Sequence, residues 1–336
     1  MNRPPSIVAI TIGDPAGIGP EIALKTARNV APEVGVVVVG DLDVVRRVNE
    51  DCDFGITLTE LAEVTRERAT QADIVPVIDL DNVSDHEYGV VRGDYGQASL
   101  EYLEYALGKV TDGDLDGVVG GPVNAKAITR SNFRFDSPSS LVLHYADVDQ
   151  YSIMLSTEGL HVSHVTPEVP LKDVPDLVTE ETTLQTIRMT ERMMRDLGTP
   201  DPRIAIAGLN PHAGLDGLRG EEDDRKIRPA IELAQDEGID AVGPESPDTV
   251  FASALNGAFD AVVSMYHDQG HIPVKTVGSM DGEIDVSAIP LGLPFPYSAL
   301  GHGTAFDIAG HCEASPASAE RSIRLVAQIA RNADAS

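Results

Sequence analysis

The chain has 336 residues, of which 42% are hydrophobic and 24% charged, and its formal net charge at pH 7 is −29. This length and apolar content predict a folded protein with a substantial core and two domains, and exclude a disordered chain. The acidic surface excludes nucleic acid and anionic membranes as partners, because like charges repel at ordinary salt.

Three further features narrow the class of protein. The sequence shows no apolar run of membrane-spanning length and no signal-peptide layout, so we expect a cytoplasmic protein without a membrane partner. Cys52 and Cys312 are too few for a disulfide framework or a thiolate metal site. The surface is acidic and poor in lysine, which suits a protein kept soluble in a salt-rich cytosol, where screening shortens charge repulsion. We therefore predict a halophilic protein.

Alternating apolar runs and helical periodicity predict α/β layering in the first half of the chain. The expected strands are 6–12, 36–40, 74–78 and 117–123, with a helix over 96–110. Between the first strand and a helix that opens at Pro20 lies a glycine-rich turn, 13–19. Such a turn can offer backbone N–H groups to an anion. The alternative is a tight turn that uses glycine for backbone freedom.

The second half continues the same pattern. We expect a loop at 133–144 that enters an apolar segment, a turn at 242–248 and an acidic insertion at 278–285. The predicted regular elements are a hairpin of strands 152–156 and 161–165, a strand at 203–208, and helices at 182–197, 221–236, 249–255 and 317–330.

Residues 261–275 break abruptly from an apolar strand into polar chemistry. The strand 261–263 is followed by Tyr266, His267, Asp268 and Gln269, and Lys275 adds a cation that can reach back. In an open α/β sheet, ligands bind beyond the carboxyl ends of the strands. The alternative is a strand-to-loop exit with an accidental polar cluster.

A second histidine, His212, also lies just past a strand end, in a glycine-bounded loop. For each histidine the alternative to a ligand is a structural, hydrogen-bonded loop residue. Several short motifs accompany these two histidines: GDPAGIGPE (13–21), GGPV (120–123), GLNPHAG (208–214), PDT (247–249), SMYHDQG (264–270), LGLPF (291–295) and HGTAFDIAG (302–310).

Together these motifs, in this order, resemble the 4-hydroxythreonine-4-phosphate dehydrogenase family of NAD-dependent enzymes. The last motif also resembles the adenosine-binding segment of isocitrate and isopropylmalate dehydrogenases. The resemblance implies a two-domain α/β fold of the isocitrate/isopropylmalate dehydrogenase type, with the active-site cleft between the domains. We place a cofactor-side domain at 1–125 plus 275–336 and a central domain at 126–274. The resemblance further implies a homodimer with shared active sites.

The chemistry implied by the resemblance is oxidation of a secondary alcohol with NAD or NADP, followed by loss of CO2 from the β-keto acid. A divalent metal (Mn, Mg, Zn or Co) lowers the pKa of the hydroxyl and holds the enolate charge. Two of the family's three metal histidines match His212 and His267. Glu168 stands at the third position, where a carboxylate can also ligate a cation. His164 is a less favoured substitute, and Asp268 orients a ligand or adds one.

The remaining roles also follow from the resemblance. Lys275 binds substrate and steadies negative charge, or acts as acid or base, and Asp248 contacts the site. The adenosine half of NAD is expected at His302, Gly303 and Thr304.

The substrate positions depart from the family pattern. Pro138 and Ser139 replace a His-Thr pair, and Tyr297 replaces an arginine. The lost charge-assisted hydrogen bonds, each worth about 1.5–3 kcal/mol, are enough to change the substrate.

The sequence leaves three functions open. The first is a metal- and NAD(P)-dependent dehydrogenase that acts on a different 3-hydroxy acid. The second is a homologue that binds a small ligand without turnover, and the third is an acyl- or phosphotransferase on a related fold. The first is favoured because His212, His267, Asp268 and Lys275 match the family pattern.

Overall fold

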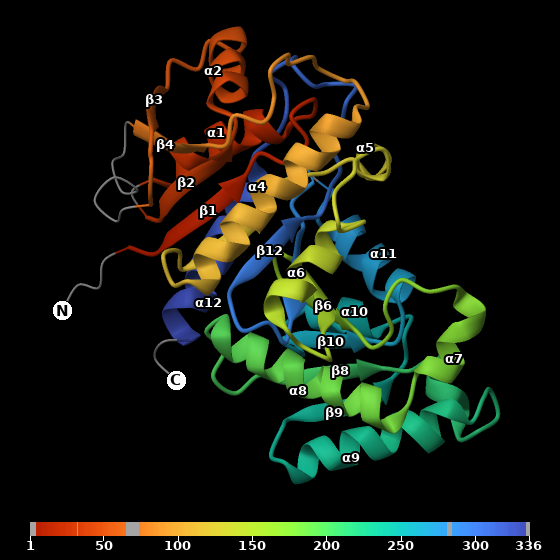
Figure 1. Ribbon diagram of the computed structural model, residues 1–336. Helices are drawn as coiled ribbons and strands as arrows, with labels where there is room; N and C mark the ends of the chain where they lie inside the picture. The colour runs from red at the N-terminus through yellow and green to blue at the C-terminus, as the bar shows by residue number, and fades with distance from the viewer. Residues whose placement is uncertain (1–4, 32, 65–73, 281–283, 334–336) are drawn as a thin grey trace. The chain divides into compact units, whose positions relative to one another are not determined.

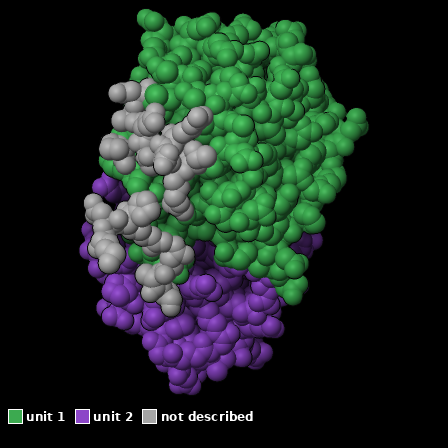
Figure 2. All heavy atoms as spheres, turned by 60° about the vertical axis from the view of Figure 1, so that its left-hand side comes forward, with its two compact units in different colours: residues 1–149, 293–334 green, residues 150–292, 335–336 purple. Residues whose placement is uncertain are grey.

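The computed structural model describes residues 5–31, 33–64, 74–280 and 284–333 (Figure 1). The chain divides into two compact units, which Figure 2 shows in different colours. Unit 1 consists of residues 1–149 and 293–334, and unit 2 of residues 150–292 with 335–336.

Unit 1 is built on a parallel sheet in the order β3-β4-β2-β1-β5-β12. Strands β1 and β2 are buried along their whole length, as expected for a parallel sheet covered on both faces. The strands of this unit are β1 (Ile7–Thr11), β2 (Gly35–Gly40), β3 (Thr57–Glu60), β4 (Ile74–Asp79), β5 (Gly117–Gly120) and β12 (Tyr297–Leu300).

Helices cover both faces of this sheet (Figure 1). The connections β1-α1-β2 and β4-α4-β5 move across the sheet in opposite directions, so right-handed crossovers place α1 and α4 on opposite faces. Helix α12 packs beside α1, and α5 and α6 pack against α4. The helices of this unit are α1 (Gly19–Val30), α2 (Leu42–Asp51), α4 (Gly93–Thr111), α5 (Ala125–Thr129), α6 (Pro138–Ala146) and α12 (Ala317–Ala333).

Unit 2 contains a mixed sheet in the order β11-β6-β7-β10-β8-β9. Its first two pairings are antiparallel and the other three parallel. The elements are β6 (Ser152–Thr157), β7 (Leu160–His164), α7 (Val174–Leu177), α8 (Glu180–Asp196), β8 (Ile204–Ala207), α9 (Arg228–Asp236), β9 (Ala241–Glu245), α10 (Val250–Leu255), β10 (Ala261–Ser264), α11 (His267–Val277) and β11 (Ser287–Leu291).

Successive residues of β10 point into two different cores. Val263 packs in one core with residues of α8 and α9, whereas Val262 packs in the other with residues of α10 and α11. Because successive side chains of a strand point to opposite faces of the sheet, β10 contributes to both cores and is buried on both faces. Because β10 pairs in parallel with β7 and β8, the carboxyl ends of these three strands lie at one edge of the sheet.

The structure confirms the predicted strands of β1, β2, β4, β5, β8 and β10, the hairpin of β6 and β7, and the helices α1, α4, α8, α10 and α12. The predicted helix at 221–236 is a π-helix over Asp223–Ile227 followed by α9, and three other predicted segments differ. The expected loop at 133–144 contains α6, because the Ser137 hydroxyl accepts the Ser140 N–H and Pro138 suits a first turn. The expected turn at 242–248 begins as β9, which pairs with β8. The polar residues after β10 start the helix α11, not a loop.

The division into units falls at 149/150 and 292/293, not after 125 and 274 as the sequence suggested. Residues 138–146 stay with unit 1 because α6 packs on α4. Residues after 275 stay with unit 2 because α11 continues to Val277 and β11 pairs with β6. The predicted acidic insertion at 278–285 lies partly outside the described residues.

Cys52 and Cys312 form a disulfide. Two cysteines were too few to predict a disulfide framework, and this single bond joins residues 260 positions apart in the chain. Among the described helices, none has both the length and the apolar character needed to cross a membrane.

Candidate active site

Helix α11 carries two histidines and a lysine on one face. His267 is its first residue, and His271 and Lys275 follow at intervals of four, which places all three side by side along the helix. The rings of His267 and His271 stack with centroids 3.6 Å apart and planes inclined by 18°. Sequence reasoning missed His271, although the i, i+4 histidine spacing is a signal it could have used.

The neighbouring carboxylate fixes the orientation of His267. Its Nδ1 lies 2.7 Å from Asp268 Oδ1, and because an ionised carboxylate only accepts, this nitrogen is the donor. The lone pair of neutral His267 is therefore on Nε2, the nitrogen left for a ligand. This supports the predicted orienting role of Asp268.

A buried histidine, His164, makes a hydrogen bond to one ring of the stacked pair. His164, at the end of β7, donates from Nδ1 to the Ile153 carbonyl (2.8 Å), and its Nε2 accepts from His271 Nδ1 (3.1 Å). Burial lowers the pKa of His164 to about 4, and burial together with nearby histidines lowers the pKa of His271 to about 3. Both imidazoles are therefore neutral at pH 7.

His212 lies in a backbone segment of unusual conformation. His212, Ala213, Leu215 and Asp216 have φ between +47° and +56°, and Gly214 has φ of +77°. Each non-glycine residue in the left-handed region costs about 1 kcal/mol, and such residues concentrate at functional sites. Surrounding contacts must therefore hold this loop.

Asp223 supplies those contacts. Its buried carboxylate accepts the backbone N–H groups of Leu209 (2.9 Å) and Asn210 (3.2 Å) and the Asn210 side-chain amide (2.7 Å). The loop also approaches closely at Gly208, where a Cβ would lie 2.7 Å from Asp223 Oδ1. Sequence reasoning missed Asp223, because nothing in a charged helical segment marks one acid as buried.

A cavity of about 640 Å³ brings three of the predicted residues of unit 2 together. His212, Asp248 and Asp268 all line it, with Tyr266 and Gln269 among the other lining residues. The Ser246 hydroxyl donates to Asp248 (2.6 Å) and lowers the pKa of that carboxyl, with a smaller contribution from His212.

Gln269 joins the ends of two strands beside this cavity. Its Nε2 donates to the Gly208 carbonyl (2.9 Å), and its Oε1 accepts the Met265 N–H (2.6 Å). The loop of His212 and the start of α11 are therefore held together.

Some of the predicted residues of unit 1 line a smaller cavity of about 160 Å³, but Gly303 and Thr304 are not among them. Tyr297, His302 and Pro138 line it, whereas Ser139 is exposed and does not. Tyr297 is 5% exposed, and burial raises the pKa of its hydroxyl well above the usual range. Its hydroxyl approaches Gly120, where a Cβ would lie 2.5 Å from that oxygen, so this position requires glycine.

Comparison with known proteins places the chain in a family. The profile described as "Pyridoxal phosphate biosynthetic protein PdxA" matches residues 33–326. The chain belongs to the PdxA family. A relative from Clostridium botulinum, named "Putative D-threonate 4-phosphate dehydrogenase", is 35% identical over 331 residues, 97% of each chain. The resemblance found in the sequence is confirmed.

Solved structures agree with this assignment. The 4-hydroxythreonine-4-phosphate dehydrogenase of Klebsiella pneumoniae superposes with a TM-score of 0.85 at 34% identity, covering 98% of this chain and 99% of that one. The β-decarboxylating dehydrogenase of Thermococcus kodakarensis matches with a TM-score of 0.51 at 16% identity over 95% and 81% of the two chains, which shows the shared fold. The predicted fold class is confirmed, and this PdxA-family chain is an oxidoreductase that acts on CH–OH groups.

The metal ligands predicted for this PdxA-family chain are only partly assembled. His212 lines the large cavity and His267 is oriented beside it, but Glu168 is exposed and does not line the cavity. Within the described ranges, no three His, Cys, Asp or Glu side chains are placed to hold one metal ion. The residues thus supply two imidazole donors without a complete ligand set.

Four N–H groups of the glycine-rich turn, those of Asp14, Ala16, Gly17 and Ile18, already have hydrogen-bond partners in the protein. The Ile18 N–H donates to the Thr304 carbonyl (3.0 Å), and the N–H groups of Asp14, Ala16 and Gly17 donate to Pro122 or within the turn. This favours the alternative of a tight structural turn. The turn also carries Asp14, whose pKa burial raises to about 6.

Proposed function

We propose that this chain is an NAD(P)-dependent dehydrogenase that oxidises the 3-hydroxyl of a phosphorylated hydroxy acid, with loss of CO2 from the product. The observation that carries the proposal is the large cavity of unit 2. It is lined by His212, Asp248 and Asp268, and Asp268 in turn orients His267. These are the residues that the family resemblance assigns to the chemistry.

The substrate class follows from the relatives and from the altered positions. The relatives named above act, by name, on D-threonate 4-phosphate or 4-hydroxythreonine 4-phosphate. These two acids differ at C2, which carries a hydroxyl in the first and an amino group in the second. The replacements at Ser139 and Tyr297 support a changed substrate pocket, so we favour a D-threonate 4-phosphate type of acid.

Oxidation of the alcohol removes a hydride from its carbon and a proton from its oxygen. A bound nicotinamide would accept the hydride. Asp268 and Asp248 face the cavity and can hold or accept a proton. Lys275, exposed on the same face of α11 as His267, can bind a substrate anion and steady the charge that develops when CO2 leaves.

The proposal also assigns residues that would bind the nicotinamide cofactor and a divalent metal ion. His302, Gly303 and Thr304 would contact the adenosine half of NAD or NADP, and Gly303 is exposed with open space around its Cα. A divalent ion (Mn, Mg, Zn or Co) would supply Lewis-acid chemistry, with His212 and His267 as donors and Glu168 as the proposed third ligand. No step is assigned to the ion, since the ligand set is incomplete. The resemblance also supports a homodimer, which sedimentation would test.

Turnover measurements test the proposal. NADH or NADPH formation is followed with D-threonate 4-phosphate, 4-hydroxythreonine 4-phosphate and unphosphorylated 3-hydroxy acids, each with Mn²⁺, Mg²⁺, Zn²⁺ or Co²⁺. We expect a phosphorylated acid of the threonate type to give the highest kcat/KM and to release CO2. If no acid is oxidised and neither cofactor binds, the chain is a ligand-binding homologue without turnover.

The change His267→Ala tests the ligand assignment. Loss of one imidazole should lower activity by about 100-fold or more and weaken binding of Mn²⁺ measured by calorimetry. His144→Ala removes an exposed imidazole from α6 and should change neither quantity. Unchanged Mn²⁺ affinity in His267→Ala would rule out His267 as a ligand.

A further inference from the structure

One of the two cysteines follows a helix, and the other lies in a segment without regular secondary structure. Cys52 directly follows α2, whereas Cys312 lies in segment 301–316, the stretch between β12 and α12. This described segment contains neither helix nor strand and includes His302, Gly303 and Thr304. The disulfide therefore ties an irregular segment of unit 1 to the end of a helix.

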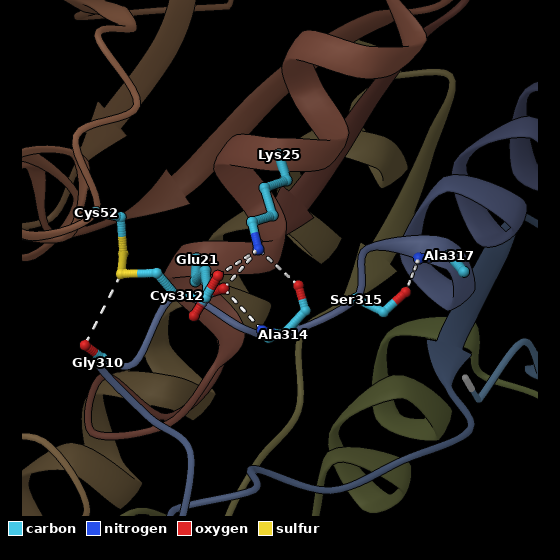
Figure 3. Close-up of polar contacts among 8 residues, drawn as sticks. All are labelled: Glu21, Lys25, Cys52, Gly310, Cys312, Ala314, Ser315 and Ala317. Carbon is cyan, nitrogen blue, oxygen red and sulfur yellow. Dashed lines mark hydrogen bonds and ion pairs between the residues drawn. A yellow bond between two sulfur atoms is a disulfide. The ribbon is translucent and has the colours of Figure 1, made fainter. Parts of the chain in front are cut away.

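A buried ion pair holds the same segment without covalent bonds (Figure 3). Lys25 Nζ donates to the carbonyls of Cys312 (3.1 Å) and Ala314 (2.7 Å), and it pairs with Glu21 Oε1 (2.7 Å). The same Glu21 oxygen accepts the Ala314 N–H (2.9 Å), and Glu21 is only 2% exposed. Lys25 also lies 5.5 Å from the ring centre of Phe54, two residues after Cys52.

Near its other end, segment 301–316 makes a backbone hydrogen bond to the residue before α1. The Thr304 carbonyl accepts the Ile18 N–H (3.0 Å) at the start of α1. Between this bond and the contacts at 312–314, Ala309 is buried in the core of unit 1, and Ala305, Phe306 and Ile308 pack partly against it. The segment is therefore held by its two ends and by this packing, and releasing one end should increase the motion of the residues between them.

Neither cysteine is fully buried, which leaves room for a small thiol to approach the disulfide. Each is partly exposed, and the Gly310 carbonyl lies 3.8 Å from Cys312 Sγ. After reduction, that oxygen is a ready acceptor for the Cys312 thiol.

We propose that Cys52 and Cys312 form a thiol-modifiable crosslink that controls the order of segment 301–316 and, through it, the affinity for the nicotinamide cofactor. The second part rests on the proposed function. The modifying reagent is a dithiol: its two thiols give two electrons and two protons to the disulfide. The S–S bond of the protein breaks to give two thiols, and the dithiol becomes a disulfide.

Hydrogen–deuterium exchange tests the first part without any cofactor. The full chain is compared before and after treatment with dithiothreitol, with thiols counted by mass spectrometry after alkylation. We expect faster exchange within 301–316 and unchanged exchange in β1 and β2. Two free thiols in protein treated with oxidised glutathione, or unchanged exchange at 301–316 after reduction, would overturn the proposal. A lower melting temperature with unchanged exchange would mean a purely structural crosslink, which also overturns it.

Cofactor titration tests the second part. Ordering a loop in advance typically changes affinity by a few-fold, so reduction should raise the Kd for NAD by about fivefold. The double variant C52S/C312S should show the same Kd as the reduced protein and no response to dithiothreitol. If NAD binds in neither state, the proposed function fails, while the exchange experiment still decides the crosslink.

The variant Lys25→Met separates the two attachments. With the disulfide intact, its effect on exchange at 301–316 should be small, because the covalent tie remains. In the C52S/C312S background the same change should accelerate exchange strongly. Equal effects in both backgrounds would contradict a shared role of the two attachments.

Discussion

At the residue scale, the buried histidine His164 links stability to pH. Its pKa is about 4 in the folded protein and 6.5 ordinarily, because burial disfavours the charged ring. Between these values the unfolded chain binds more protons, so stability rises with pH and is lost as the pH falls from 6.5 to 4. The difference corresponds to about 3 kcal/mol for this one group. The lowered pKa of His271 acts in the same direction.

His164→Asn should therefore flatten the pH dependence of unfolding between pH 6.5 and 4. Urea denaturation at a series of pH values, with a chelator present, measures the slope. His311→Asn changes an exposed histidine and should leave the slope as it is in the unaltered protein. A His164→Asn curve parallel to that of the unaltered protein would show that His164 does not carry this linkage.

At the scale of elements, the loop of His212 depends on one carboxylate from another segment. Asp223→Ala would remove the acceptor of two backbone N–H groups and one side-chain amide while the loop keeps its left-handed residues. Leaving these donors unpaired should lower the free energy of unfolding by about 3–5 kcal/mol. Asp224→Asn, which removes only a surface pair with Arg228, should cost less than about 1 kcal/mol by the same denaturation assay. Similar losses in the two variants would refute the special role of Asp223.

The same loop shows what the sequence could and could not predict. The strand before His212 and the strand before His267 were predictable, because buried β-branched runs have a clear pattern. The helix α11 was not, because its first turn is made of polar residues and it contains Pro273. The left-handed loop and its buried support, Asp223, depend on contacts between segments, which local sequence does not encode.

In the candidate site too, features encoded in local motifs were predictable, and features that depend on contacts between distant residues were not. Motifs predicted that His212, Asp248 and Asp268 belong together, and the cavity of unit 2 contains all three. They did not predict the neutral pair of His164 and His271, or the disulfide, because both arise from residues far apart in the chain. Glu168, chosen by alignment alone, remains an exposed residue whose role is a prediction.

At the scale of the whole molecule, the excess of acidic residues predicts a dependence on salt. Acidic residues outnumber basic ones by 54 to 25, so most carboxylates cannot each have a basic partner. Their repulsion destabilises the compact state, and screening shortens to about 3 Å at 1 M salt. We therefore expect the melting temperature to rise by several degrees, roughly 5–10 °C, between 0.1 and 2 M KCl.

The control for this prediction removes the charge instead of screening it. Near the isoelectric point of about 4.4 the net charge vanishes, so the same increase in KCl should raise the melting temperature much less. A salt effect of equal size at pH 7 and pH 4.4 would point to a general effect of KCl on protein hydration and not to charge repulsion. No gain at pH 7 would contradict the prediction of a halophilic protein, because the net charge of −29 would then carry no measurable cost at low salt.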